Sequence, residues 1–214
     1  MATVIDVFAD IVCPFTHVGL RRFVSRRRDS GRDDVRLRIL AWPLEIVNGA
    51  PLDADFVAEE IDQLRQTVAS DLFSGFRPDV FPRSSLPALA LASAASAVGI
   101  DVGEQVGLEL RDQLFEKGED LCDHDILAGV AERYGVPFGD SAQERERVLV
   151  EYVDGTHRGV KGSPHYFTPH GDFFCPALDI SRDAAGHLHI QADPGSFDDF
   201  IDACFDLPLQ PLGR

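Results

Sequence analysis

One cysteine stands at a position where a protein chain can make a thiol reactive. Cys13 directly follows a β-rich run at residues 3–9 and directly precedes Pro14, a residue suited to the first turn of a helix. Partial positive charge and unpaired N–H groups at a helix start can lower the pKa of a cysteine well below its free value of about 8.5. An ionised Asp10 facing the sulfur would oppose this effect. The alternative is a buried cysteine that merely precedes a helix.

A second feature lies far along the chain, at Ser163-Pro164. The stretch 159–164 reads Gly-Val-Lys-Gly-Ser-Pro and comes just before a short aromatic strand. X-Pro bonds are the usual sites of cis peptides in specified turns. We expect Pro164 to pack beside the helix that follows Cys13, which would leave the backbone of Ser163 open to an extended peptide or a thiol ligand. A plain loop proline is the alternative, and only the pairing with Cys13 makes the motif informative.

The first turn of the predicted helix carries two more polar candidates. Thr16 lies one helical turn from Cys13, so its hydroxyl can donate a hydrogen bond to a thiolate. His17 is either solvent-exposed or catalytic, as a cation that favours the thiolate or as a neutral imidazole that moves a proton. We therefore expect Cys13 and Thr16 to be catalytic. Substrate contacts are expected from the residues around them: Pro14, Phe15, His17, Ser163 and Pro164.

The remaining cysteines give a weaker signal. No two of the four cysteines have CxxC spacing, and the histidine spacings do not match a zinc site, so we expect free thiols and no metal. Cys204 lies in an apolar run and is expected to be a buried small hydrophobic residue. Cys175 could approach Cys13 as a second thiol, but a core or edge-strand position is favoured.

The order of elements indicates an α/β chain. Runs at 3–9 and 35–42 are predicted strands on either side of a helix at 14–28, so the first two strands should be parallel. The middle, 51–156, is predicted to be almost all helix, apart from a loop at 73–85. The chain ends with short strands, an edge strand or bulge around Pro176, and a last helix: 165–167, 173–175, 178–180, 187–190 and 196–204.

These elements sum to βαβ, a helical insertion, and ββ(β)α, which is the thioredoxin arrangement. We expect a thioredoxin-like domain built from 1–50 and 157–214, with 51–156 as a helical insertion subdomain. Within the insertion, residues 141–144 have the form of a capping box, and Gly155 is expected to end the helix that starts there. Another helix is expected to begin after Asp123 and to stop at Gly135.

Composition and charge exclude several classes of partner. The net charge is −16, from 36 acidic and 20 basic residues, so nucleic acid and anionic membranes are unfavourable partners. Arginines gather once, at 21–28, where a solvated helix face is favoured over an anion-steering patch. No apolar run approaches the roughly 20 residues of a membrane span. The N-terminus has no basic, then apolar, signal pattern, so a cytoplasmic protein is expected.

The motifs around Cys13 resemble those of the FrnE-like DsbA family. The stretch 10–16, Asp-Ile-Val-Cys-Pro-Phe-Thr, resembles its active-site turn, which is usually a Cys-Pro-x-Cys dithiol. Residues 41–45, 120–136 and 159–167 resemble its segment after the second strand, an insertion helix and its cis-proline loop. The resemblance spans about 3–167 and implies a thioredoxin fold, a helical insertion and thiol–disulfide chemistry. Related members, 2-hydroxychromene-2-carboxylate isomerase and kappa-class glutathione transferases, have a serine in place of Cys13.

The chain departs from the family at the second cysteine, which is Thr16 here. A dithiol enzyme resolves its mixed disulfide with that second thiol, and a threonine hydroxyl cannot do so. A monothiol route remains, in which Cys13 forms a mixed disulfide and a low-molecular-weight thiol such as glutathione or mycothiol releases it. Related proteins are often dimeric, so a homodimer is also considered.

Three functions from different classes fit these residues. The first is a monothiol, DsbA-like oxidoreductase that acts on a protein or small substrate. The second is an isomerase or transferase in which Cys13 or Thr16 activates the sulfur of a bound thiol cofactor. The third is a binding module that kept the fold and lost catalysis. We rank them in that order, with a narrow gap between the first two.

Overall fold

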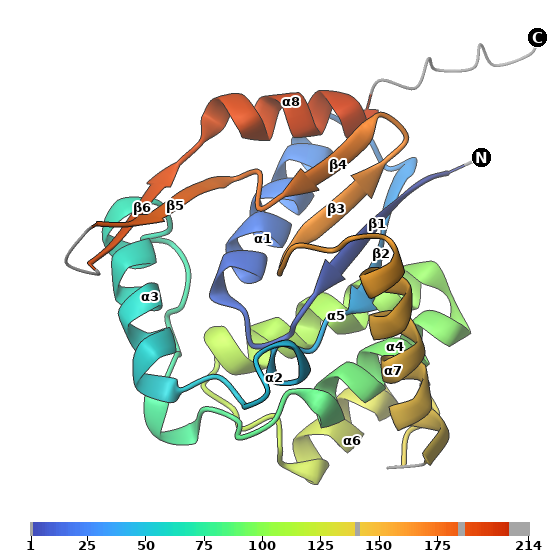
Figure 1. The fold of residues 1–214 in the computed structure, drawn as a ribbon. Helices are drawn as coiled ribbons and strands as arrows, with labels where there is room; N and C mark the ends of the chain where they lie inside the picture. The colour runs from blue at the N-terminus through green and yellow to red at the C-terminus, as the bar shows by residue number, and fades with distance from the viewer. Residues whose placement is uncertain (1, 140–141, 184–186, 206–214) are drawn as a thin grey trace, which may run out of the picture.

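A four-stranded sheet forms the centre of the molecule. The structure, a computed structural model, describes residues 2–139, 142–183 and 187–205. The strand order is β2-β1-β3-β4 (Figure 1). Strands β1 and β2 are parallel as predicted, while β3 pairs antiparallel with both β1 and β4. The bounds of the four strands are β1 (Thr3–Ala9), β2 (Val35–Ala41), β3 (His165–Thr168) and β4 (Gly171–Phe174).

The first β-α-β unit places Cys13 at a helix start. Helix α1 (Pro14–Asp29) begins at Pro14, and Cys13 is its N-cap residue. Leu20 and Phe23 of α1 are fully buried against the apolar side chains of β1 and β2. Alternate residues of β2 are buried, which is the pattern expected of a strand with one face in a core. Cys13 therefore lies just beyond the C-terminal end of the interior strand β1, at the start of α1.

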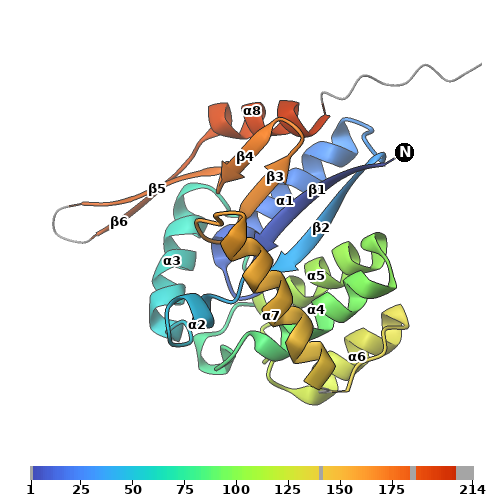
Figure 2. The ribbon, with the colours of Figure 1, turned by 45° about the vertical axis from the view of Figure 1, so that its right-hand side comes forward.

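The predicted helical insertion is present between β2 and β3. Figure 2 shows α4, α5, α6 and α7 gathered on the β2 side of the sheet, where α4, α5 and α7 contact β2, whereas α3 lies apart from them and contacts α1. Asp53 caps α3 by accepting hydrogen bonds from the N–H groups of Asp55 and Phe56, and Gly135 ends α6 in a left-handed conformation. The elements are α2 (Leu44–Val47), α3 (Ala54–Thr67), a 3-10 turn η1 (Pro78–Val80), α4 (Leu86–Val98), α5 (Ile100–Phe115), α6 (His124–Tyr134) and α7 (Ala142–His157).

Gly155 does not end its helix, so that prediction is wrong. Helix α7 continues through Gly155 to His157. A Cβ atom at position 155 would lie 2.8 Å from the ring of Trp42 and 2.9 Å from that of Phe8. The glycine therefore serves close approach of α7 to the sheet and not helix termination. The predicted capping residue Ser141 lies outside the described residues.

The C-terminal part differs in detail from the predicted ββ(β)α order. Strands β5 (Leu178–Arg182) and β6 (Leu188–Ala192) do not join the main sheet but form a two-stranded sheet of their own that contacts α3 (Figure 1). The chain leaves β4 through Cys175, whose φ of 47° is in the left-handed region, directly before Pro176. Helix α8 (Pro194–Phe205) follows and packs Phe200 against Phe23 of α1.

The arginines of α1 are all engaged by acidic side chains. Arg22 pairs with Asp71 at 2.7 Å, and Arg26 pairs with Asp198 at 2.9 Å. The other ion pairs join Arg21 to Asp112, Arg27 to Glu104 and Arg28 to Asp29. The favoured solvated face is therefore a set of ion pairs, and most of them tie α1 to other elements. In the described part of the chain, no helix is long and apolar enough to cross a bilayer.

Candidate functional site

The sulfur of Cys13 contacts the loop that precedes β3. Cys13 Sγ donates a hydrogen bond to the carbonyl oxygen of Ser163, with 3.2 Å between sulfur and oxygen. The Ser163–Pro164 peptide bond is cis, and the Pro164 ring lies beside Gly19 of α1. The side chain of Cys13 is only 3% exposed. The two motifs that lie 150 residues apart in the sequence thus meet at one point.

Ser163 joins three segments of the site. Its hydroxyl accepts a hydrogen bond from the N–H of Asp10 at 2.9 Å and lies 2.7 Å from the hydroxyl of Thr16. Its carbonyl accepts the hydrogen bond from Cys13. The exit of β1, the first turn of α1 and the loop before β3 are therefore held together through one buried serine. Pro14 and Pro164 are buried beside it, while Phe15 is partly buried.

Burial, not the helix start, dominates the acidity of Cys13. Burial raises its pKa above the usual value, and the negative charge of Glu60 raises it further. The hydroxyl and backbone of Thr16 and the hydroxyl of Ser163 act in the opposite direction and lower it. The net pKa is raised, so the expected low value is wrong for the resting protein. The thiol is instead a hydrogen-bond donor.

The carboxylate of Asp10 supports the turn around Cys13 through hydrogen bonds to groups other than the sulfur. Its carboxylate accepts hydrogen bonds from the N–H of Leu44 at 2.6 Å, the N–H of Val12 at 3.2 Å and the hydroxyl of Ser85 at 3.1 Å. Burial raises the pKa of Asp10 to about 6 in spite of these bonds. The residue ties the Cys13 turn to the starts of α2 and α4.

The Cys13 thiol thus faces the carbonyl group of the residue before a cis-proline, in a fold with a four-stranded sheet and a helical insertion. Residues 4–182 match the DSBA-like thioredoxin domain family. The chain belongs to this family. The match covers β1 to β5 together with the insertion and ends before β6 and α8. No curated protein matches the chain by sequence.

Solved structures share this DSBA-like fold at low sequence identity. HCCA isomerase (2-hydroxychromene-2-carboxylate isomerase) superposes with a TM-score of 0.60 and 15% identity over 80% of this chain and 88% of that chain. A "probable DsbA oxidoreductase" from Streptomyces coelicolor gives 0.61 and 16% over 99% and 93%. The cytosolic disulfide reductase DsbM from Pseudomonas aeruginosa, solved with GSH, gives 0.57 and 12% over 95% and 100%. Structures of disulfide enzymes and of an isomerase thus share the fold.

His17 is turned into the helical insertion of this DSBA-like chain. It is 1% exposed, so the solvent-exposed interpretation is wrong. Its Nε2 lies 2.8 Å from Glu116, and its ring packs between Phe73 and Phe115. Burial lowers the pKa of His17. Burial also acts to raise the pKa of Glu116, but hydrogen bonds from His17 and from the N–H groups of Phe73 and Ser74 lower it to about 2.

Two charged residues near Cys13 were missed from the sequence. Arg111 of α5 is fully buried and donates to the carbonyl of Asp10 at 3.0 Å and to that of Gly107 at 2.6 Å. Burial lowers its pKa to about 10. The small residue one turn before it, Gly107, is the one signal that could have suggested an inward arginine. Glu60 of α3, also buried, carried no comparable signal.

The other cysteines occupy three different settings. Cys175 is buried, and its N–H donates to the carbonyl of Pro164 at 3.0 Å. Burial raises the pKa of Cys175, and the nearby Cys13 adds to the effect. Cys204 is fully buried as expected, and Cys122 is half-buried. No cluster of three histidine, cysteine, aspartate or glutamate side chains suited to a metal exists within the described ranges.

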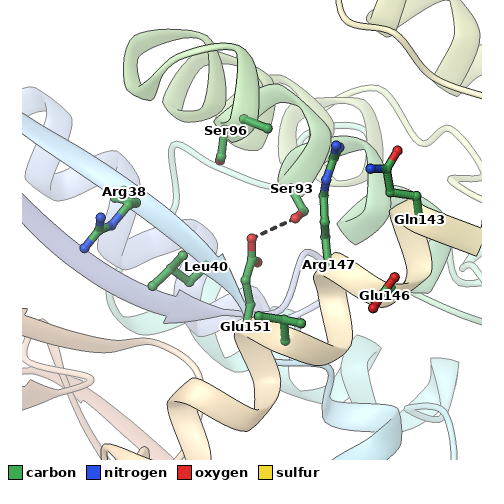
Figure 3. A pocket seen from close by; sticks show the side chains of 10 residues that line it. Arg38, Leu40, Ser93, Ser96, Gln143, Glu146, Arg147 and Glu151 are labelled. Carbon is green, nitrogen blue, oxygen red and sulfur yellow. Dashed lines mark hydrogen bonds between the residues drawn. The ribbon is translucent and has the colours of Figure 1, made fainter.

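A separate pocket lies between β2, α4 and α7. Figure 3 shows Glu151 of α7 reaching Ser93 of α4, with Arg38 and Arg147 at the sides. The carboxylate of Glu151 accepts a hydrogen bond from the Ser93 hydroxyl at 2.7 Å and one from the N–H of Ala41 at 2.7 Å. Glu151 thus satisfies the backbone at the free edge of β2. Cysteine is not among the residues that line this pocket, and we assign it no part in the chemistry of Cys13.

Proposed function

We propose that this chain is a DsbA-like thiol–disulfide oxidoreductase that works through Cys13 as its single nucleophile. The observation that carries the proposal is the 3.2 Å contact between Cys13 Sγ and the carbonyl oxygen of Ser163. A disulfide or thiol ligand that pairs with the backbone before Pro164 would bring its sulfur to Cys13. Thr16 stands where a second thiol would resolve the product, which supports a monothiol route.

The proposed thiol–disulfide exchange needs no bound cofactor, because the substrate disulfide and a small thiol are the two redox partners. The Cys13 thiolate attacks one sulfur of a substrate disulfide, the S–S bond breaks, and the departing thiolate takes up a proton. A low-molecular-weight thiol such as glutathione or mycothiol then attacks the mixed disulfide and restores Cys13. The structure of DsbM with GSH supports a small thiol as reductant. Pro14, Phe15, Ser163 and Pro164 would contact the substrate, whereas the buried ring of His17 would support the first turn.

Compartment, assembly and domain limits are part of the same proposal. We infer a cytoplasmic location, because a reducing pool of small thiols is needed for the second step. We also propose a homodimer, which sedimentation would reveal as twice the 23.5 kDa chain mass. The proposed division is a thioredoxin-like domain of 1–50 and 157–214 with an insertion subdomain of 51–156.

Mass spectrometry of the disulfide intermediate tests the proposal. The reduced chain is mixed with bis(2-hydroxyethyl) disulfide, and the adduct is mapped before and after addition of glutathione. We expect an adduct on Cys13 that the added thiol removes, no such adduct in Cys13→Ser, and an unchanged reaction in Cys122→Ser. A Cys13 that stays unmodified while the chain still binds a thiol would favour a non-catalytic binding module instead.

One observation favours a thiol-dependent isomerase or transferase as a second candidate. The raised pKa of Cys13 and its hydrogen bond to Ser163 describe a protonated donor. Such a donor could stabilise the sulfur anion of a bound thiol cofactor, as a serine hydroxyl could. An isomerisation or conjugation activity that survives Cys13→Ser, without any disulfide exchange, would select this candidate.

A further inference from the structure

His165 is a buried histidine whose two ring nitrogens both have partners. It follows Pro164 directly, begins β3, and has a side chain that is only 1% exposed. Its Nδ1 accepts a hydrogen bond from the backbone N–H of Lys161 at 3.1 Å, and its Nε2 lies 2.9 Å from the carboxylate of Asp172 on β4. A backbone N–H can only donate, so Nδ1 is unprotonated and Nε2 carries the proton that Asp172 accepts. The ring is therefore neutral in this arrangement.

The hydrogen bond between Lys161 and His165 spans the residues that face the reactive sulfur. It joins the two ends of the segment 161–165, in the connection from α7 to β3 (Figure 1). Ser163 is the middle residue of that segment, and its carbonyl oxygen accepts the hydrogen bond from Cys13 Sγ at 3.2 Å. The direction of this carbonyl therefore depends on the backbone conformation that the bond between Lys161 and His165 supports.

Aromatic packing fixes the orientation of the His165 ring. The ring of Phe174 meets it edge-on, with 6.0 Å between the ring centroids, and the ring of Phe167 lies 4.7 Å away. The loop before β3 also approaches this group closely, because a Cβ atom at Gly162 would lie 2.8 Å from the ring of Phe174. The imidazole is thus held in one orientation, with its Nδ1 directed at the backbone of the loop.

Protonation of His165 would break its bond to the loop. A proton on Nδ1 would face the N–H of Lys161, so two donors would oppose each other. Burial lowers the pKa of His165, the hydrogen bond to Asp172 acts in the opposite direction, and the net pKa lies below the ordinary value. The positive charges of Lys161 and Arg158 also lower it, and Asp6, on the same face of β1, is paired with Arg158 at 2.7 Å. The ring is therefore neutral at physiological pH and gains its proton in acidic solution.

We propose that His165 is a positioning residue of the Cys13 site, which in its neutral form holds the loop so that the backbone at Ser163 stays in place for a substrate. This inference rests on the proposed function of Cys13 and adds a pH-dependent support to it. His165 acts through the backbone of Lys161 and not on the sulfur. Loss of its support should therefore impair the docking of a disulfide against the loop, beyond any change in the acidity of the thiol.

Two reactions at the same sulfur separate docking from thiol acidity. The first is adduct formation on Cys13 with the disulfide of N-acetylcysteinamide, a neutral probe whose amide groups can pair with the loop backbone. The second is alkylation of Cys13 with iodoacetamide, a small electrophile that needs no such pairing. Both reagents consume the thiolate, so the fraction of thiolate cancels when the disulfide rate is divided by the alkylation rate. The resulting docking ratio is measured by mass spectrometry for each variant.

Two amide variants separate the two hydrogen bonds of His165. Asparagine can place its oxygen near the position of Nδ1 and keep the bond from Lys161, whereas glutamine reaches the position of Nε2 and keeps only the bond to Asp172. At pH 8 we expect His165→Gln to lower the docking ratio about fivefold, the rate equivalent of one hydrogen bond, and His165→Asn to stay close to wild type. His170→Gln, at an exposed histidine in the turn between β3 and β4, is the matched control.

The outcomes of this comparison decide between three readings. A His165→Gln chain with the wild-type docking ratio overturns the inference. A His165→Asn chain that falls as far as His165→Gln also overturns it, because the ring would then matter for packing alone. A wild-type chain that reacts with iodoacetamide at Cys13 but forms no disulfide adduct overturns the proposed function itself, and the inference with it.

A pH series from 8 to 5 tests the requirement for the neutral ring. The wild-type docking ratio should fall below about pH 6.5, and His165→Asn should lack this fall because it has no ring to protonate. Asp172→Asn, at a side chain that is 47% exposed, should move the fall to lower pH, because the carboxylate that raises the pKa of His165 is gone. Thermal unfolding of each variant at both pH limits shows that the chain stays folded. A fall that persists unchanged in His165→Asn belongs to another group and contradicts the inference.

Discussion

The hydroxyls of Thr16 and Ser163 lie 2.7 Å apart and join the first turn of α1 to the loop before β3. Thr16 is fully buried, and Ser163 also holds the N–H of Asp10 and the sulfur of Cys13. In the Cys-Pro-x-Cys turn that this chain resembles, the second cysteine stands at the position of Thr16. Here Thr16 instead contributes to the hydrogen bonds that support the Cys13 thiol. The hydroxyl of Thr16 acts on Cys13 as well, since it lowers the pKa of the thiol.

Thr16→Val should therefore raise the pKa of Cys13 and destabilise the fold. The variant keeps the side-chain shape but removes one of the two hydrogen bonds of the buried Ser163 hydroxyl, which keeps only the bond from the N–H of Asp10, so unfolding free energy should fall by about 1–2 kcal/mol. Iodoacetamide alkylation across a pH series measures the first effect, and urea unfolding measures the second. Thr67→Val removes an exposed helical hydroxyl and is the control. An alkylation profile identical to wild type would contradict the assigned role.

Glu60 should make stability fall as pH rises. Its pKa is about 7 in the folded chain and about 4.5 in the unfolded chain, so the folded state holds the extra proton between these values. Stability attributable to the protonated form is present below pH 4.5 and is lost by pH 7. The advantage of Glu60→Gln over wild type should thus grow by up to about 3 kcal/mol from pH 4.5 to 8. Urea unfolding at both pH values measures it, and a constant difference would be inconsistent with a raised pKa.

Two glycines in helices should respond in opposite ways to alanine. At Gly155 a methyl group would meet the ring of Trp42 at 2.8 Å, so Gly155→Ala should destabilise by about 1–3 kcal/mol. At Gly129, on the exposed face of α6, a methyl group would meet nothing within 4 Å. Gly129→Ala should therefore stabilise by about 0.5–1 kcal/mol through helix propensity. Thermal unfolding of both variants gives the comparison, and equal shifts would refute the packing argument for Gly155.

The features of the fold that depend on a few neighbouring residues were predicted correctly. Alternation in β2, the Pro14 helix start and the Gly135 stop each rest on a few neighbouring residues, and each is present in the structure. The meeting of Cys13 with Ser163 was inferred because the thioredoxin order of elements brings those loops together.

Long-range contacts account for what the sequence did not predict. His17 is buried because Phe73 and Phe115 of the insertion surround its ring, and nothing in the first helix announces them. The acidity of Cys13 was misjudged for the same reason, since burial depends on how the insertion and the loops cover the sulfur. Gly155 looked like a stop signal because the approaching ring of Trp42 lies more than 100 residues away in sequence.

Arg111 should prove to be the most sensitive charged residue outside the Cys13 turn. Its guanidinium is fully buried and holds the carbonyl of Asp10, three residues before Cys13, so it links α5 of the insertion to the reactive turn. Arg111→Met fills much of the same volume but removes the donor to the Asp10 carbonyl, and it leaves the Gly107 carbonyl with only its bond inside helix α5. The loss should be about 2–4 kcal/mol of unfolding free energy, because two buried acceptors lose hydrogen bonds to a charged group.

Arg111→Lys separates charge from geometry in the same position. A lysine keeps the positive charge but cannot present two N–H groups to both carbonyls in the fixed fork of a guanidinium, so it should recover only part of the loss. Arg133→Met, at an exposed ion pair with Glu109, should change stability by less than about 1 kcal/mol and is the control. Urea unfolding compares the three variants. Full recovery by lysine would show that the charge of Arg111, and not its hydrogen bond to Asp10, is what the turn requires.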